Sequence, residues 1–233
     1  PYDTLASARV TSRTSNRVRM DKSLLKIFNM IDTKKDGVID KREVLISLSG
    51  RGNAKIASLL SYFEPLKALL KPSTYEEALS LMSTNASNKV SFDEFRAFCT
   101  VVVEEVEDAV LSQDGGIDVE SDDWIMDSAR VSSRVEDVLQ RDLALKRLFT
   151  ALQGSTTKTH LEKRHVLKSL HTDRSIVNLL KLEQSLSALA FPQTFGATFD
   201  ALAVGSESGD KVSWLEFRAF CSSVSDEQTV ASI

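Results

Sequence analysis

The order of apolar and polar positions divides the chain into short amphipathic segments with a helical period. Apolar residues recur every three or four positions, which places them on one face of an α-helix. One such face stops at Asp32 and another stops before Ser83, and after a polar stretch a new apolar face begins each time. These faces comprise Met20, Leu24, Ile27, Phe28 and Ile31, then Val44, Leu45 and Leu48, then Tyr75, Ala78, Leu79 and Met82, and finally Phe92, Phe95, Phe98 and Val102. The pattern predicts helix, loop, helix twice in succession, with little strand.

The same arrangement returns in the second half of the chain, which identifies an internal duplication. The segment KVSFDEFRAFC, residues 89–99, reappears as KVSWLEFRAFC, residues 211–221. We therefore predict an all-α fold of two lobes. The predicted parts are an N-terminal arm at 1–19, lobe 1 at 20–103, an acidic linker at 104–131, lobe 2 at 132–226 and a C-terminal tail at 227–233.

Each copy leaves room for a further helix between its two loops. The apolar positions of this segment are Ile56, Leu59, Leu60, Phe63 and Leu70 in the first copy, and Ile176, Leu179, Leu180, Leu186 and Leu189 in the second. Pro65 is expected to kink or restart the helix of the first copy. We expect each additional helix to pack on the apolar groove of its own lobe.

The first loop, DTKKDGVIDKRE from Asp32 to Glu43, resembles the calcium loop of the EF-hand superfamily. Acids stand at loop positions one, five and nine, Gly37 at position six and a glutamate at position twelve. The whole chain then resembles a divergent calmodulin-like protein with two duplicated EF-hand pairs. For a calcium ion the resemblance implies carboxylate ligands from Asp32, Asp36 and Asp40, the backbone carbonyl of Val38, and both oxygens of Glu43.

The four loops differ in how many oxygen ligands they offer. Lys34 at position three of the first loop removes a ligand and adds a positive charge, so its affinity for calcium should fall; its ammonium group could instead pair with a neighbouring carboxylate. The second loop, residues 83–94, carries only weaker candidates, which are Ser83, Asn85, Ser87, Lys89 and Glu94. In the second copy, loop three near 153–165 has no acid at either end. Loop four at 205–216 has no acid at positions one and five and retains Glu207 and Glu216. Calcium is therefore the expected cofactor, in the first hand if anywhere.

A short β contact is expected to join the two loops of each copy at position eight. The predicted pairs are Ile39 with Val90 and Leu161 with Val212. Because this contact needs no metal, a hand that has lost its ligands can keep its fold.

Charge and composition narrow the possible functions. The net charge is −4, so the chain lacks the overall positive charge that favours nucleic acid binding. It has two cysteines in 233 residues, which favours a reducing compartment. The first 19 residues are rich in arginine without any acid after Asp3, which is typical of a flexible arm or of the tail of an organelle presequence. The spacer from Glu104 to Asp127 has no basic residue, and it is expected to be a solvated linker or a docking strip for a basic partner.

No catalytic motif is recognisable in the sequence, and the chain is not expected to be an enzyme. The favoured interpretation is an intracellular structural or adaptor protein that binds protein partners in a larger assembly, with at most weak calcium binding. The alternatives are a calcium sensor that regulates a target protein, or the regulatory EF-hand region of a larger enzyme. The cytoplasm or the cytoskeleton is the expected location, with an organelle after presequence removal as the alternative.

Overall fold

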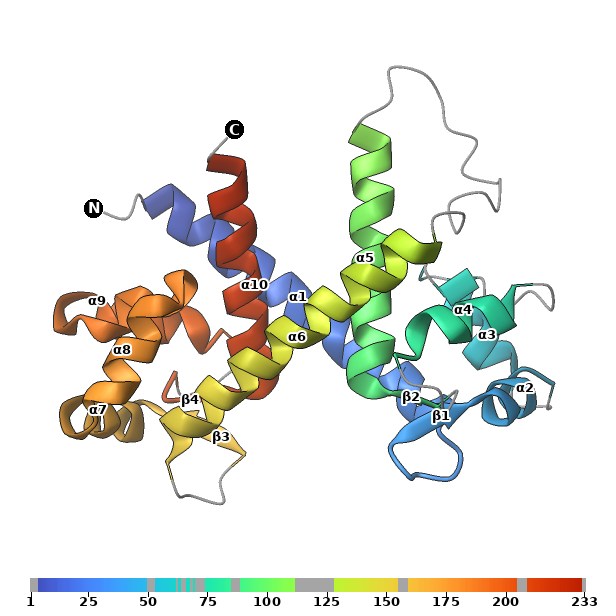
Figure 1. Ribbon diagram of the computed structural model, residues 1–233, viewed down its shortest axis with the longest axis horizontal. Helices are drawn as coiled ribbons and strands as arrows, with labels where there is room; N and C mark the ends of the chain where they lie inside the picture. The colour runs from blue at the N-terminus through green and yellow to red at the C-terminus, as the bar shows by residue number, and fades with distance from the viewer. Residues whose placement is uncertain are drawn as a thin grey trace. The chain divides into compact units, whose positions relative to one another are not determined.

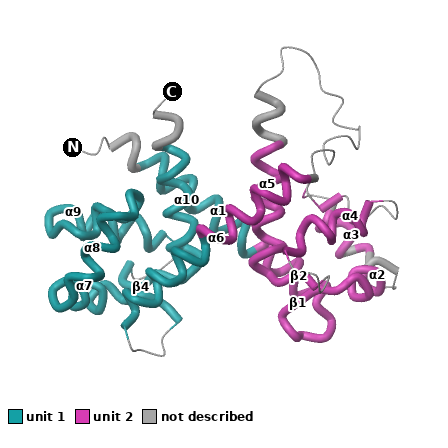
Figure 2. Tube along the Cα trace, in the orientation of Figure 1, with its two compact units in different colours: residues 1–22, 142–233 teal, residues 23–141 magenta. Residues whose placement is uncertain are grey.

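The computed structural model describes residues 4–49, 53–61, 63, 66–67, 69, 74–84, 89–111, 128–154, 159–204 and 209–231, and the chain divides into two compact units. Unit 1 comprises residues 1–22 and 142–233, and unit 2 comprises residues 23–141 (Figure 2). Both are built from α-helices with a short two-stranded sheet, which confirms the predicted all-α class (Figure 1). None of the described helices combines the length and the apolar content needed to span a membrane.

The two copies of the duplication share the order of their described α-helices and strands, and the described elements of the second copy also include a 3-10 helix. The described elements of the first copy are α1 (Thr4–Ile31), β1 (Val38–Asp40), α2 (Lys41–Ser49), α3 (Asn53–Ser61), α4 (Tyr75–Met82), β2 (Lys89–Ser91) and α5 (Phe92–Leu111). Those of the second copy are α6 (Ser128–Gln153), β3 (His160–Glu162), α7 (Lys163–Thr172), α8 (Arg174–Leu182), the 3-10 helix η3 (Gln184–Ala190), α9 (Pro192–Leu202), β4 (Lys211–Ser213) and α10 (Trp214–Ala231).

A short antiparallel sheet joins the two loops of each unit. Ile39 of β1 lies opposite Val90 of β2, and Leu161 of β3 lies opposite Val212 of β4. Both predicted pairs are thus confirmed. All four side chains are buried, so the sheets are held by apolar packing as well as by backbone hydrogen bonds.

In each unit, aromatic rings pack between the helix that precedes the first loop and the helix that follows the second loop. In unit 2, the ring of Phe28 on α1 lies edge-on to Phe95 on α5, with ring centroids 5.7 Å apart. In unit 1, Phe149 on α6 makes the same kind of contact with Phe217 on α10, at 5.3 Å. Edge-to-face pairs of this kind add to the burial energy of the rings.

The segment between the two loops fills the core of each unit, as the sequence predicts. In unit 1, Leu180 of α8 and Leu186 and Leu189 of η3 belong to one hydrophobic cluster. This cluster also contains Phe149 of α6, Leu161 of β3 and Phe217 of α10. In unit 2, Leu69 lines the same small apolar space as Ile31, Ile39, Val44, Leu79, Met82, Val90 and Phe95. In each unit, the core therefore already holds an apolar segment from between the two loops.

Two residues assigned to apolar helix faces lie at the surface instead. Leu45 of α2 is 42% exposed and Leu179 of α8 is 47% exposed. Both helices are only 9 residues long and bury a narrow face, which carries Val44 in α2 and Leu180 in α8. Leu70 and Pro65 lie outside the described residues.

The structure divides the chain differently from the predicted boundaries. Residues 4–19 are not a separate arm, because they form one continuous helix with residues 20–31. Residues 104–111 of the predicted linker continue α5, residues 128–131 begin α6, and residues 112–127 between them lie outside the described part. Each long helix, α1 and α6, passes from one unit to the other, after Lys22 and after Arg141.

Candidate metal centre

The first loop begins where α1 ends and is shaped by two residues with positive φ. Lys35 has φ of 58° and Gly37 has φ of 81°. This conformation is the one that glycine adopts without cost at the sharp turn of such a loop. The backbone N–H of Gly37 donates to Oδ2 of Asp32 over 3.0 Å, which closes the turn onto the first acid.

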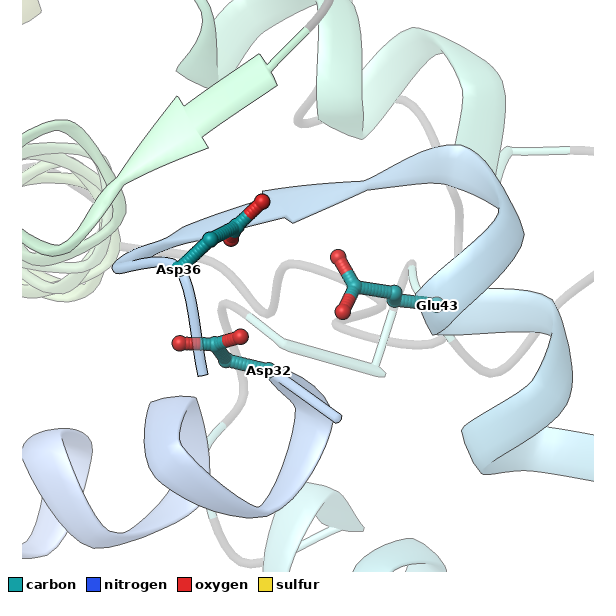
Figure 3. Close-up of side chains that lie close together, drawn as sticks. All are labelled: Asp32, Asp36 and Glu43. Carbon is teal, nitrogen blue, oxygen red and sulfur yellow. The ribbon is translucent and has the colours of Figure 1, made fainter. Parts of the chain in front are cut away.

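Three of the predicted ligands converge in this loop (Figure 3). Asp32, Asp36 and Glu43 each offer a carboxylate oxygen, and these oxygens lie within 4.8 Å of one another. The residues Asp32 and Glu43 are buried, at 3% and 1% exposure. Oδ1 of Asp32 is buried and has no hydrogen-bond partner among the described residues. Converging acids and an unsatisfied buried oxygen fit a hard divalent cation such as calcium.

Lys34 places its own positive charge beside these acids. Its Nζ donates to Oδ2 of Asp40 and lies 3.7 Å from Oε2 of Glu43. The hydrogen bond between Lys34 and Asp40 raises the pKa of the lysine and lowers the pKa of the carboxyl group. The predicted ligand Asp40 is therefore held by an internal ammonium group, which an incoming cation must displace.

Glu43 is also satisfied by donors of its own loop. Oε1 accepts from the backbone N–H of Lys34 over 3.0 Å and from the hydroxyl of Thr33 over 3.2 Å, and Oε2 accepts from the N–H of Asp40 over 3.2 Å. These bonds hold the loop closed without a metal. The N–H of Val38 donates to Oδ1 of Asp36 over 3.2 Å. The role of the Val38 carbonyl as a calcium ligand stays a prediction.

The second loop is closed by hydrogen bonds to Glu94, its only predicted carboxylate ligand. Oε1 accepts from the backbone N–H and the hydroxyl of Thr84, at 3.0 and 2.7 Å. Oε2 accepts from the N–H and the hydroxyl of Ser91, at 2.7 and 2.8 Å. Ser83 donates its hydroxyl to the carbonyl of Lys89, whose side chain is exposed, while Asn85 and Ser87 lie outside the described residues.

These hydrogen bonds predict a pH dependence of stability. Burial alone would raise the pKa of Glu94, but the bonds from Ser91 and Thr84 outweigh it and lower the pKa below its ordinary value of 4.5. The ionised carboxylate therefore stabilises the fold above pH 4.5, and this stabilisation is lost as the pH falls through the lower folded value. We expect Glu94→Gln to reduce the free energy of unfolding by about 1 kcal/mol at neutral pH. Urea unfolding should show this difference shrinking as the pH is lowered from 4.5.

The control for this experiment is Glu77→Gln. Glu77 is exposed on α4, in the same unit, so its substitution should change the free energy of unfolding little at any pH. If the two variants showed the same pH dependence, the hydrogen bonds to Glu94 would not be its source.

In both loops of the second copy, the residue at position twelve has a partner from the chain itself. Glu216 at position twelve of loop four accepts from the N–H and the hydroxyl of Ser213, both over 2.7 Å. In loop three, the pairing of Leu161 with Val212 puts His165 at position twelve, and its Nδ1 lies 2.8 Å from Oε2 of Glu162. A histidine cannot supply the two oxygens that this position gives to calcium. The other retained acid of loop four, Glu207, lies outside the described residues.

Comparison with known proteins agrees with the geometry of the first loop. The family model described as EF hand matches residues 25–44, which cover the end of α1, the loop and the start of α2. No curated protein and no solved structure matched the chain. The family match and the arrangement of Asp32, Asp36 and Glu43 both indicate an EF-hand at residues 25–44.

Proposed function

We propose that the chain is an EF-hand adaptor, a divergent calmodulin-like protein whose two pairs of hands bind protein partners in a larger assembly. The observation behind the proposal is that, in three of the four loops, the carboxylate at position twelve already accepts hydrogen bonds from donors of the chain. Those donors serve Glu43, Glu94 and Glu216, and in loop three a histidine takes the place of the acid. Loops that close without calcium favour a constant scaffold over a calcium-driven switch.

The filled cores of the two units support the same proposal. A calcium sensor opens on binding and exposes an apolar groove to its target. In this chain, Leu69 of unit 2 and Leu186 and Leu189 of unit 1 pack against the apolar residues of the hands. Opening would have to expel these side chains, each of which contributes about 1.5–3 kcal/mol by being buried.

The alternative is a calcium sensor that regulates a target, either as a separate protein or as part of a larger enzyme. One observation favours it: Asp32 keeps a buried oxygen without a hydrogen bond, next to oxygens of Asp36 and Glu43. Calcium would satisfy this oxygen. Lys34 opposes such binding, because its ammonium group must first leave Asp40.

Location and chemistry follow from the adaptor proposal. Cys99 and Cys221 are buried and form no disulfide in the described part of the chain, which is compatible with a reducing compartment. We place the protein in the cytoplasm or on the cytoskeleton, with an organelle as the alternative, and we assign it no catalytic role.

Calorimetric titration with calcium distinguishes the adaptor from the sensor. The adaptor predicts no site tighter than about 1 mM at physiological ionic strength. A sensor predicts a dissociation constant of about 0.1–10 μM that is lost in Glu43→Gln. Glu216→Gln, which changes the same loop position in the second copy, is the matched control and should leave either result unchanged.

A further inference from the structure

The duplication extends further towards the N-terminus of each copy than the predicted lobes do. The sequence SARVTSR at residues 7–13 returns as SARVSSR at residues 128–134. We call the helical segments that carry these sequences the head segments: residues 4–22 of α1 and residues 128–141 of α6. One belongs to the predicted arm and the other begins in the predicted linker.

In unit 2, the head segment of α6 is bound to α5 by arginine and glutamate side chains. Arg134 donates to Oε2 of Glu104 over 2.9 Å and also to Glu105. Arg130 forms a second ion pair with Glu105, at 3.2 Å. On the same helix, Val131 and Val135 are buried, so the head segment also has an apolar face that is removed from solvent.

In unit 1, the head segment of α1 is bound to α10 in the same register. Arg13 donates to Oε2 of Glu227 over 2.7 Å, and Arg9 lies 4.0 Å from the other carboxylate oxygen. Arg17 adds a bond of 2.6 Å to Asp226. The residue pairs correspond between the copies: two arginines four positions apart share one glutamate in each unit. Here the buried face of the head segment carries Val10, Thr14, Val18 and Asp21.

A buried ion pair completes the contact in unit 1. Nη2 of Arg218 on α10 donates to Oδ2 of Asp21 over 2.6 Å, and both side chains are almost wholly buried. Such a pair is specific, because removal of one partner leaves the other charge buried without compensation. The surface of α10 therefore recognises a helix with a defined pattern of arginine, valine and aspartate.

The head segments are exchanged between the copies. The hands of the first copy hold the head segment of the second copy, in unit 2, and the hands of the second copy hold the head segment of the first, in unit 1. Each head segment therefore docks on the hands of the other copy. The same contacts require only that a head segment be supplied by some chain, and a second molecule of this protein supplies an identical one.

We propose that the α10 surface of unit 1 is a docking site for the head segment, residues 4–22, of a second copy of this chain, so that two molecules exchange their head segments. The proposal rests on the adaptor function in one respect, since it names one partner of the adaptor. It does not involve calcium. The test below reads molecular mass, so its failure and a failure of the adaptor proposal in the calcium titration are distinguishable.

Reversal of charges on the two sides of the contact tests the exchange in the full-length chain. The head variant is Arg13→Glu with Arg17→Glu, and the acceptor variant is Asp226→Arg with Glu227→Arg. Each variant alone repels its own head segment and should have the mass of one chain, 25.8 kDa, in light scattering. In an equimolar mixture both exchanged contacts again join opposite charges, so the mass should double.

The matched control carries all four substitutions in one chain, which restores opposite charges within the molecule. Like the unaltered chain, it should have a head segment that is protected from amide hydrogen exchange, and it should form dimers only to the extent that the unaltered chain does at the same concentration. If the mixture kept the mass of one chain, the exchange would be refuted, whether or not the four-fold variant showed a protected head segment.

A second measurement covers the case in which a reversed variant does not fold. Unaltered chains with natural and with heavy nitrogen are mixed at concentrations up to about 1 mM and followed by native mass spectrometry. Dimers of intermediate mass are expected to increase with concentration. Absence of mixed dimers over the whole range would contradict the proposal.

Discussion

Replacement of Arg218 by methionine is expected to lower the free energy of unfolding of unit 1 by about 3–5 kcal/mol. The guanidinium group donates to Asp21 over 2.6 Å, lies 3.7 Å from Asp142, and its side chain is only 2% exposed. Methionine matches much of the volume but leaves the carboxylate of Asp21 buried without its partner. Urea unfolding followed by the fluorescence of Trp214, which lies 5.9 Å from the guanidinium carbon, measures the effect in a Trp124→Phe background.

The control is Arg164→Met, the same substitution at an exposed position of α7 in the same unit. It should change the free energy of unfolding by less than about 0.5 kcal/mol. A loss below about 1 kcal/mol in Arg218→Met would show that the buried ion pair does not hold the head segment in unit 1.

Replacement of Lys34 by aspartate is expected to tighten calcium binding by about 100-fold, and replacement by asparagine by about 10-fold. Both changes remove the ammonium group that holds Asp40 and supply an oxygen at position three. Aspartate also adds a negative charge to a site where Asp32, Asp36 and Glu43 already converge. Calorimetric titration of the variants and the unaltered chain measures the change.

Lys35→Asp is the matched control for this prediction. It makes the same change in charge one position later, at a loop position that supplies no ligand. Lys35 has φ of 58°, a conformation that aspartate tolerates better than most residues. If Lys35→Asp tightened binding as much as Lys34→Asp, the gain would come from net charge and not from the removal of the internal ammonium group.

Local patterns in the sequence were enough to predict the frame of the hands. The spacing of apolar residues around Asp32 and Ser83 predicted the helices, and the β contact expected at loop position eight predicted the pairing of Ile39 with Val90 and of Leu161 with Val212. These features depend on helical period and loop length, which neighbouring residues determine. The exposure of Leu45 could not be predicted this way, because it depends on which side of a short helix its neighbours cover.

The head segments were not predicted, although the sequence contained a signal for them. SARVTSR and SARVSSR match at six of seven positions, but one lies in an arginine-rich stretch and the other follows an acidic one. Read separately, these stretches look like an arm and a linker. Their charges are complementary to those of other helices, and only the folded structure shows this. Arg134 pairs with Glu104 in unit 2, and Arg13 pairs with Glu227 in unit 1.

The candidate metal centre was predictable in its residues but not in its bonding. Position in the loop indicated Asp32, Asp36 and Glu43, and the structure brings these three together. The sequence left open whether Lys34 would pair with a carboxylate, and the structure pairs it with Asp40. That outcome depends on the path of one flexible side chain, which residue spacing does not determine.

We infer that the loops at residues 32–43, 83–94 and 205–216 are held closed by donors of the chain itself and not by calcium. Amide hydrogen exchange of the unaltered protein, in a calcium chelator and then in excess calcium, tests this inference. We predict that the N–H groups of Gly37, Asp40, Thr84, Ser91 and Ser213, which donate to loop carboxylates, are already protected in the chelator. Rapid exchange of these amides in the chelator, with protection only after calcium is added, would show that calcium and not the chain closes the loops.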